Sequence, residues 1–210
     1  MDAAISAPAH GAGAGFSDER KVRLGFLFYV LTDVTFVIFL MVSYVWLRAY
    51  NTPGTDPTLG GAWFPYKGMA LPDAATTNLL VVLIVASAVF FFIAQRGIAM
   101  GNQLLLRLGL VVALALAVVT LVMQMRFMGA QQFAAKDGSF ASTWLLLSGY
   151  HVYHLAIGVF LGLALTIRAF RGKYTRERHL GLVTVGYFWY WMALMPILVW
   201  LMMTLLPPKI

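Results

Sequence analysis

The chain has 210 residues, of which 61% are hydrophobic and 11% are charged. Soluble domains average about 45–50% apolar and about 25% charged residues, so a water-soluble fold could not bury this much apolar surface. The sequence contains no cysteine, which excludes disulfides, thiolate metal sites and iron–sulfur clusters. The net charge is +7, and the charged residues lie between apolar runs. This pattern favours a membrane protein over a nucleic-acid-binding protein.

The N-terminal residues are rich in Ala and Gly and lack the basic segment and apolar stretch of a signal peptide. We expect residues 1–20 to form a flexible tail, with His10 in water, and residues 21–210 to form one transmembrane domain.

Five apolar runs are each long enough to cross a bilayer core of about 30 Å, which takes about 20 helical residues. They are expected to be helices, because a single strand would leave backbone groups unpaired in lipid. The sequence therefore predicts an all-α fold, a polytopic bundle of five transmembrane helices. The predicted spans are 24–47, 75–95, 104–125, 140–167 and 181–206.

The linkers suit this division of the chain. Residues 51–72 are rich in Gly and Pro and include Trp63, Phe64 and Tyr66, which favour an interfacial loop. Residues 129–139 predict a short polar connection on the same side of the membrane.

The Lys and Arg residues indicate the direction of the chain. The predicted N-terminal flank and the second-to-third and fourth-to-fifth linkers carry ten of them, and the other side carries five. Positive charge is retained on the cytoplasmic side, so we expect a cytoplasmic N-terminus and a C-terminus on the far side. The ten residues are Arg20, Lys21, Arg23, Arg96, Arg107, Arg168, Arg171, Lys173, Arg176 and Arg178.

Asp33 is the only carboxylate well inside a predicted span. An ionised carboxylate at the bilayer centre costs at least about 2.5–3.5 kcal/mol, so this group should face protein or water, or be protonated. Tyr29, Asp33, Leu40 and Tyr44 share one helical face. Two interpretations stay open, a proton-active carboxylate and a carboxylate that fixes helix packing.

The fourth span contains two histidines, His151 and His154, followed by Gly158 and Gly162 on the same face. The glycines predict close helix contact. The histidines predict either a metal or haem site or hydrogen-bonded groups at a helix interface. We favour the interface, because haem with two histidine ligands needs them on opposite sides of the ring and a metal needs three or four ligands.

The remaining polar and aromatic features favour structural roles. Gln124 and Arg126 lie near the outer end of the third span, where Arg126 can reach the headgroups. The aromatic run 187–191 predicts packing against neighbouring helices, and Pro196 predicts a kink in the last span.

Three stretches resemble subunit III of haem–copper terminal oxidases in its five-helix bacterial form. Residues 24–33 read LGFLFYVLTD and are similar to a family span in which a hydroxyl residue, here Thr32, precedes a buried acid. Residues 77–80 read TNLL and resemble the start of the next span. Residues 148–158 read SGYHVYHLAIG and match the family pattern G-x-H-x-x-H-x-x-x-G. With the helix order, the resemblance covers nearly the whole chain after Gly15.

The chain also departs from the family pattern. The family's last helix usually has a Trp-His pair with an Asp three residues on, whereas Trp189 is followed here by Tyr190, and Ala193 stands at the Asp position. An acid usually found near Gln124 is missing as well. The resemblance is therefore to a divergent member.

The resemblance implies an accessory, cofactor-free subunit of a complex that reduces oxygen to water and pumps protons. Such a subunit packs on subunit I, which carries the haem and copper, and is expected beside subunit II and other respiratory subunits. It holds phospholipid and supports proton uptake. By carry-over, Asp33 is the buried acid and His151 and His154 are structural, in an interface cluster with Tyr29, Thr32 and Gly158. The implied location is the bacterial inner membrane, with a periplasmic or extracellular C-terminus.

Three other functions are weighed against this one. The accessory subunit of a nitric oxide reductase shares the helix plan and the histidine motif. A b-type cytochrome would carry haem on His151 or His154, but no opposing histidine is evident. A small transporter would use Asp33 as a proton relay, but we find neither inverted repeats nor paired broken helices.

Overall fold

A computed structural model describes residues 18–50 and 70–206. The described chain is all-helical and contains five long helices that are long and apolar enough to cross a membrane. A short 3-10 turn, η2, precedes the fourth of them. The elements are α1 (Asp18–Tyr50), α2 (Ala74–Ala99), α3 (Gln103–Gly129), η2 (Ala135–Asp137), α4 (Ser139–Phe170) and α5 (Leu180–Leu205).

The five predicted spans each correspond to one of these helices, so the predicted fold class is confirmed. The helices extend a few residues beyond the apolar runs, since the flanking polar residues continue the helix into the interface. Two further differences concern the N-terminal tail and the end of the last span. Residues 18–20 begin α1 rather than end a tail, and α5 ends at Leu205, one residue before the predicted end.

Several predicted features lie outside the described residues. They are the tail up to residue 17 with His10, the loop aromatics Trp63, Phe64 and Tyr66, and the last four residues. The connection between α3 and α4 is described, and it is short as predicted, with η2 inside it.

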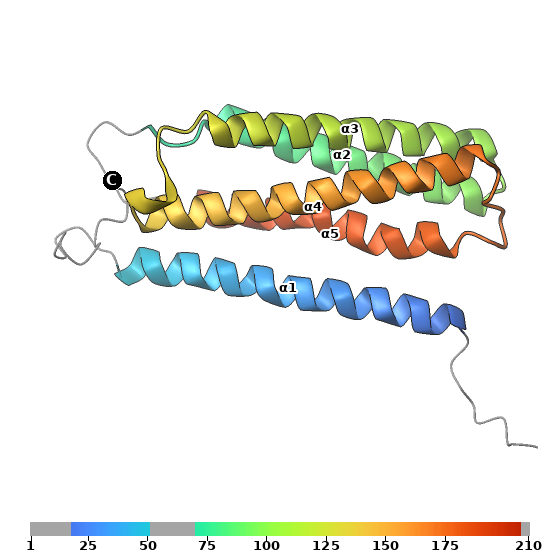
Figure 1. Ribbon diagram of the computed structural model, residues 1–210, viewed down its shortest axis with the longest axis horizontal. Helices are drawn as coiled ribbons and strands as arrows, with labels where there is room; N and C mark the ends of the chain where they lie inside the picture. The colour runs from blue at the N-terminus through green and yellow to red at the C-terminus, as the bar shows by residue number, and fades with distance from the viewer. Residues whose placement is uncertain (1–17, 51–69, 207–210) are drawn as a thin grey trace, which may run out of the picture.

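Helices α2 to α5 form a bundle, and α1 runs along one side of it (Figure 1). Within the described chain α1 packs only against α4 and α5, while α2 packs against α3 and α5. The buried residues of α1 are Asp33, Val37, Leu40 and Tyr44. Their spacing of three or four residues makes one narrow stripe, so α1 docks through a single line of side chains.

Helices α2 and α3 form the tightest pair, because glycines let their backbones approach. A Cβ added at Gly109 would lie 2.8 Å from both the Phe90 carbonyl oxygen and the Ala94 nitrogen. Ser87 on α2 also donates a 2.7 Å hydrogen bond to the Ala113 carbonyl of α3. The turn between these helices needs Gly101, whose φ of +77° is the left-handed conformation that glycine tolerates.

Glycines of the histidine motif bring α4 against α5, as predicted from their common face. A Cβ at Gly162 would lie 2.8 Å from the Trp189 ring, and one at Gly158 would overlap the side chain of Met192. Both glycines are buried. The main core lies between these helices, α2 and α3, and includes Phe91, Phe188 and Trp189.

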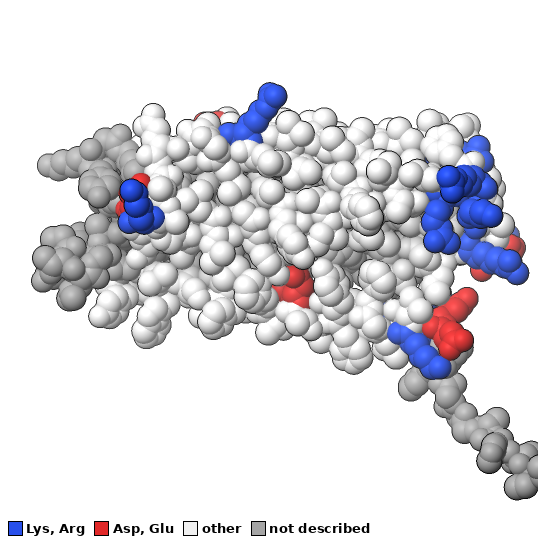
Figure 2. All heavy atoms as spheres, viewed as in Figure 1, with Lys and Arg blue, Asp and Glu red and all other residues white. Residues whose placement is uncertain are grey.

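Most charged side chains lie at the two ends of the molecule (Figure 2). Lys and Arg gather at the end where α1 begins and α4 connects to α5, and the sides are largely uncharged. At the other end Asp73 caps α2 by accepting a 2.8 Å bond from the Thr76 amide. Hydrogen bonds from the Thr76 hydroxyl and amide hold the pKa of the Asp73 carboxyl below its usual value.

The α2–α3 contact yields a first prediction. We expect Gly109→Ala to lower the free energy of unfolding by about 1–3 kcal/mol, because a methyl group there meets rigid backbone atoms. Denaturation in mixed detergent micelles, followed by circular dichroism, measures the change. Gly25→Ala is the matched control, since nothing lies within 4 Å of its added Cβ. Equal stability of the two variants would contradict the close α2–α3 contact.

Candidate functional site

The carboxylate of Asp33 is the centre of a buried polar cluster where α1 meets α4 and α5. One oxygen accepts the Tyr150 hydroxyl. The other oxygen accepts the Trp191 indole N–H and lies 2.9 Å from His154 Nε2. The side chain is 8% exposed. The sequence prediction of a buried acid at a helix interface therefore matches the structure.

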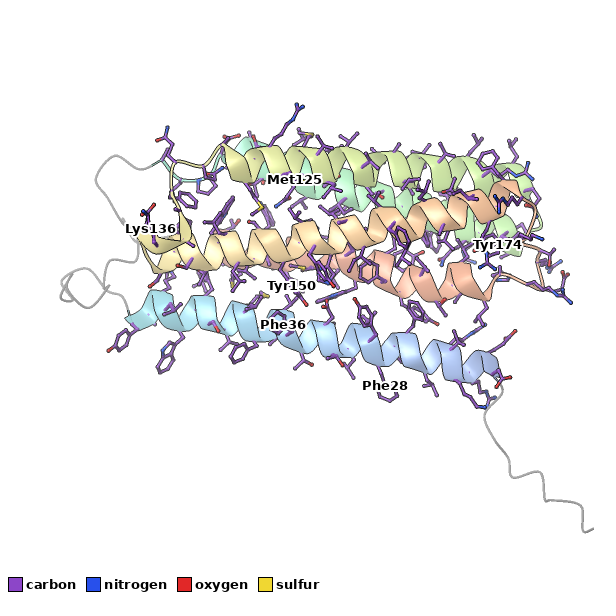
Figure 3. The ribbon with its side chains drawn as sticks, viewed as in Figure 1. Phe28, Phe36, Met125, Lys136, Tyr150 and Tyr174 are labelled. Atoms are coloured by element: carbon purple, nitrogen blue, oxygen red, sulfur yellow. The ribbon has the colours of Figure 1, made fainter. Side chains whose placement is uncertain are left out.

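The hydrogen-bond partners of Asp33 come from two helices and are positioned by ordinary helical geometry. Tyr150 and His154 are one turn apart on α4, so both side chains point toward α1. Trp191 reaches the carboxylate from α5. Figure 3 shows Tyr150 in the layer between α4 and α1, near Phe36. Three helices therefore meet at a single carboxyl group.

The hydrogen-bond partners of His154 require a shared proton between His154 and Asp33. His154 Nδ1 lies 2.8 Å from the Tyr150 carbonyl oxygen, which can only accept, so Nδ1 carries a hydrogen. The contact between Nε2 and Asp33 needs one further proton between the two groups. The pair is then either imidazolium with carboxylate or neutral imidazole with carboxylic acid. In both forms its net charge is zero, which suits a membrane interior.

Aromatic rings enclose the cluster. The Phe188 ring stacks on the His154 ring at 5.7 Å, and the Tyr150 ring lies 5.0 Å from that of Phe36. His154 itself is fully buried. Low local dielectric strengthens satisfied hydrogen bonds and makes loss of a partner costly.

The structure separates the other predicted members of the cluster. Tyr29 is 46% exposed. Its contact with the cluster is a ring contact, with 6.2 Å between the ring centroids of Tyr29 and Phe188. Thr32 is exposed, and its hydroxyl bonds to the Phe28 carbonyl of its own helix, so it lies outside the cluster. Gly158 contributes by letting α5 approach α4.

The two histidines of the motif have different surroundings. His154 contacts Asp33, whereas His151 faces a cavity between the ends of α2, α3, α4 and α5. The Nε2 atom of His151 is buried and has no hydrogen-bond partner among the described residues. The interpretation of both histidines as hydrogen-bonded interface groups therefore fits His154 and not this atom of His151.

Smaller polar contacts also tie α2 to α5. Trp189 donates a 3.2 Å bond to Ser87 and stacks on Phe91 at 4.8 Å. The Tyr190 hydroxyl donates to Gln95, whose amide donates a 3.0 Å bond to the Leu182 carbonyl. Tyr190 stands where the family pattern has His, so this departure has a hydrogen-bonding role of its own.

Sequence reasoning missed Tyr150 and Trp191 as partners of Asp33. Tyr150 lies inside the histidine motif, one turn before His154, and that spacing was a usable signal. Trp191 was indistinguishable from its aromatic neighbours in the run 187–191, which matched the prediction of packing in other respects. A buried indole N–H needs an acceptor, and Asp33 is the nearest intramembrane acid.

Among residues 18–50 and 70–206, no three His, Asp or Glu side chains lie close enough together to hold a metal ion. The Asp33 cluster supplies two such groups, Asp33 and His154, and both are hydrogen-bonded to protein partners. Chemically, the arrangement can hold a proton and clamp three helices.

Comparison with known proteins identifies the family to which the chain belongs. The family model described as cytochrome c oxidase subunit III matches residues 4–206. The chain belongs to the cytochrome c oxidase subunit III family. Membership agrees with the resemblance found at Asp33 and at the histidine motif.

The similar curated proteins are distant relatives. Cytochrome c oxidase subunit 3 of Osphranter robustus is 22% identical over 172 residues, which is 82% of this chain and 64% of that protein. The subunit of Pylaiella littoralis is 24% identical over 189 residues, covering 89% of this chain and 66% of that protein. The chain thus spans a little under two thirds of the length of these relatives, as a divergent member.

The Asp33 cluster yields a second prediction. We expect Asp33→Leu to lower the free energy of unfolding by at least about 3 kcal/mol, because Tyr150, His154 and Trp191 all lose their hydrogen-bond partner. Asp33→Asn should cost about 1–3 kcal/mol, since its NH2 group meets at least one donor. Denaturation in mixed detergent micelles measures both. Thr32→Val is the control, expected to change stability by less than about 0.5 kcal/mol. An unchanged Asp33→Leu protein would contradict a structural carboxylate.

Proposed function

We propose that this chain is the accessory subunit III of a respiratory haem–copper oxidase that reduces oxygen to water and pumps protons. It carries no haem or copper and no catalytic residue of its own. Haem and copper lie in subunit I, on which this chain packs, with subunit II and other respiratory subunits nearby. Family membership supports this assignment.

The observation that carries the proposal is the hydrogen bonding of Asp33 to two other helices. Its two oxygens are occupied by donors from α4 and α5, and His154 is fully buried. Both oxygens of Asp33 and both ring nitrogens of His154 already have a protein partner, which favours a structural role over a proton relay or a metal ligand. The cluster therefore acts as a structural clamp with a resident proton, which suits a scaffold for a catalytic partner.

The exposed side chains suggest how the subunit meets its surroundings. The outer face of α1 carries large apolar residues, among them Phe28 at 64% and Phe39 at 66% exposure. Subunit I and membrane phospholipid are the proposed neighbours of such faces, and steady packing there would support proton uptake by subunit I.

We propose a bacterial inner membrane location. The end rich in Lys and Arg, where α1 begins, is then cytoplasmic, because positive charge is retained on that side (Figure 2). The end of α5 then lies on the periplasmic or extracellular side.

The third prediction tests this function in native membranes. The chain, solubilised in mild detergent and pulled down, should bring a haem-containing complex that consumes oxygen. A reduced-minus-oxidised spectrum and an oxygen electrode record both properties. The chain expressed alone should have no Soret band.

Other outcomes of this experiment identify other functions. A haem complex that consumes nitric oxide but not oxygen would assign the chain to a nitric oxide reductase. A Soret band in the isolated chain, lost in His151→Leu or His154→Leu, would indicate a b-type cytochrome. A pull-down without haem would reject the oxidase assignment and leave a proton-linked transporter to be tested.

A further inference from the structure

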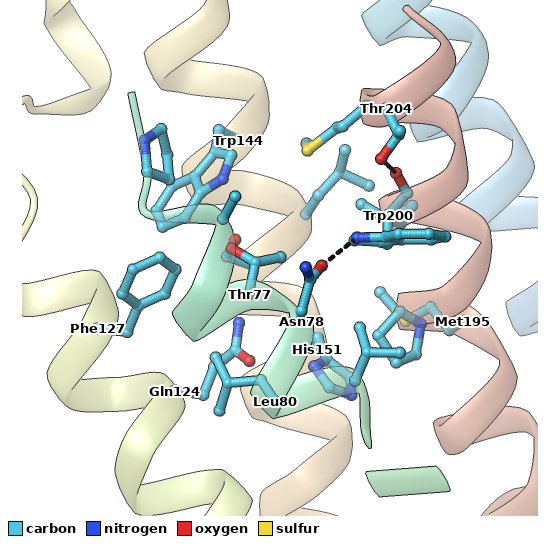
Figure 4. Close-up of a pocket in the computed structure, with 18 of the residues that line it drawn as sticks. Thr77, Asn78, Leu80, Gln124, Phe127, Trp144, His151, Met195, Trp200 and Thr204 are labelled. Carbon is cyan, nitrogen blue, oxygen red and sulfur yellow. Dashed lines mark hydrogen bonds between the residues drawn. The ribbon is translucent and has the colours of Figure 1, made fainter. Parts of the chain in front are cut away.

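A cavity of about 280 Å³ lies inside the bundle at the end opposite the Lys- and Arg-rich one. Helices α2, α3, α4 and α5 all contribute to its wall (Figure 4). Along α4 its lining runs from Phe140 to His151, which is about 16 Å at 1.5 Å per residue. The cavity therefore reaches from the interface into the apolar part of the membrane.

The inner part of the cavity is polar. His151 lines the cavity and is 4% exposed, and its buried Nε2 atom has no hydrogen-bond partner in the part of the chain that the structure describes. The Gln124 amide belongs to the same part of the wall, as Figure 4 shows. A buried polar atom without a partner costs about 1–3 kcal/mol, so an atom that hydrogen-bonds there is strongly favoured.

The rest of the wall is aromatic and apolar. Rings of Phe127, Trp144 and Trp200 line it, and the Trp200 indole is fixed by a 2.6 Å bond to Asn78. Flat aromatic side chains at the wall suit a ring-shaped ligand, which gains by stacked or edge-on contact. The volume is sufficient for one ring and the first carbons of a tail.

Within residues 18–50 and 70–206, no Lys, Arg, Asp or Glu lines the cavity. A phosphate or carboxylate head group would enter without a counter-charge, and burying an unpaired charge is far more costly than burying a neutral polar group. Anionic lipids and fatty acids are therefore disfavoured in this cavity.

We propose that this cavity binds an uncharged, lipid-soluble ring compound whose ring bears a carbonyl or hydroxyl oxygen, with that oxygen hydrogen-bonded to His151. The head of a quinone or quinol and the ring of a phenolic lipid share this chemistry. The site is separate from the Asp33 cluster, and the proposal does not depend on the oxidase assignment.

The fourth prediction tests the cavity in the full chain reconstituted in lipid nanodiscs. Decyl-benzoquinone is titrated in, and quenching of tryptophan fluorescence is followed, since Trp144 and Trp200 line the cavity. We expect saturable quenching. Unlabelled decylphenol should displace the quinone, because it keeps a ring oxygen. Decylbenzene lacks the ring oxygen and decanoate lacks the ring. Each should therefore need an at least about tenfold higher concentration to displace the quinone.

Variants tie the binding to this cavity. His151→Phe should weaken decyl-benzoquinone binding about tenfold, through loss of one hydrogen bond from a buried site. His179→Phe, at the opposite end of the bundle, is the matched control and should leave binding unchanged. Thr77→Trp places a large ring in the cavity wall and should abolish saturable quenching, which tests the cavity if His151→Phe does not fold.

Three results of these experiments would contradict binding in the cavity. Quenching that never saturates, equal affinity of the wild type and both cavity variants, or tighter binding of decanoate than of decylphenol would each overturn the proposal. Saturable quenching by decyl-benzoquinone that decylphenol cannot reverse would assign the ligand to quinones, and displacement of the quinone by decylphenol would assign it to the wider class of oxygen-bearing rings.

Discussion

A carboxylate inside a membrane must be compensated by its neighbours, and in this protein that constraint organises the packing of α1. Asp33 meets Tyr150 and His154 of α4 and Trp191 of α5. The rest of the α1 stripe is apolar apart from the Tyr44 hydroxyl, which donates to the Leu206 carbonyl at 3.2 Å. Apolar contact between helices gains little over contact with lipid, so polar contacts such as these determine where α1 sits.

The fold could be read from the sequence because the bilayer imposes simple requirements. Each span needs about 20 apolar residues and must satisfy its own backbone hydrogen bonds, which leaves the helix as the only choice. The positions of Gly158 and Gly162 also predicted the α4 face that meets a neighbour. Which helix meets that face could not be read, since five helices of similar hydrophobicity can be arranged in several ways.

The candidate site was only partly predictable for a related reason. Asp33 was evident from the sequence because a carboxylate inside a membrane span is energetically costly. Its partners were not evident, because they lie more than a hundred residues away along the chain and meet it only through helix packing. Thr32 is next to Asp33 in sequence yet points off the docking stripe, because consecutive residues in a helix differ by about 100°. His151 and His154 are three residues apart and differ by about 60° around the helix. This smaller offset turns His151 toward the cavity and His154 toward α1.

The central claim is that the Asp33 cluster holds α1 on the bundle. Because the chain has no cysteine, spin labels can be placed cleanly at Phe39→Cys on α1 and Leu194→Cys on α5, both exposed positions. Double electron–electron resonance in nanodiscs then measures the distance between the two helices. A narrow distribution that becomes broad or longer in Asp33→Leu, and stays narrow in Thr32→Val, is the predicted result. A distribution that Asp33→Leu leaves unchanged would contradict the claim.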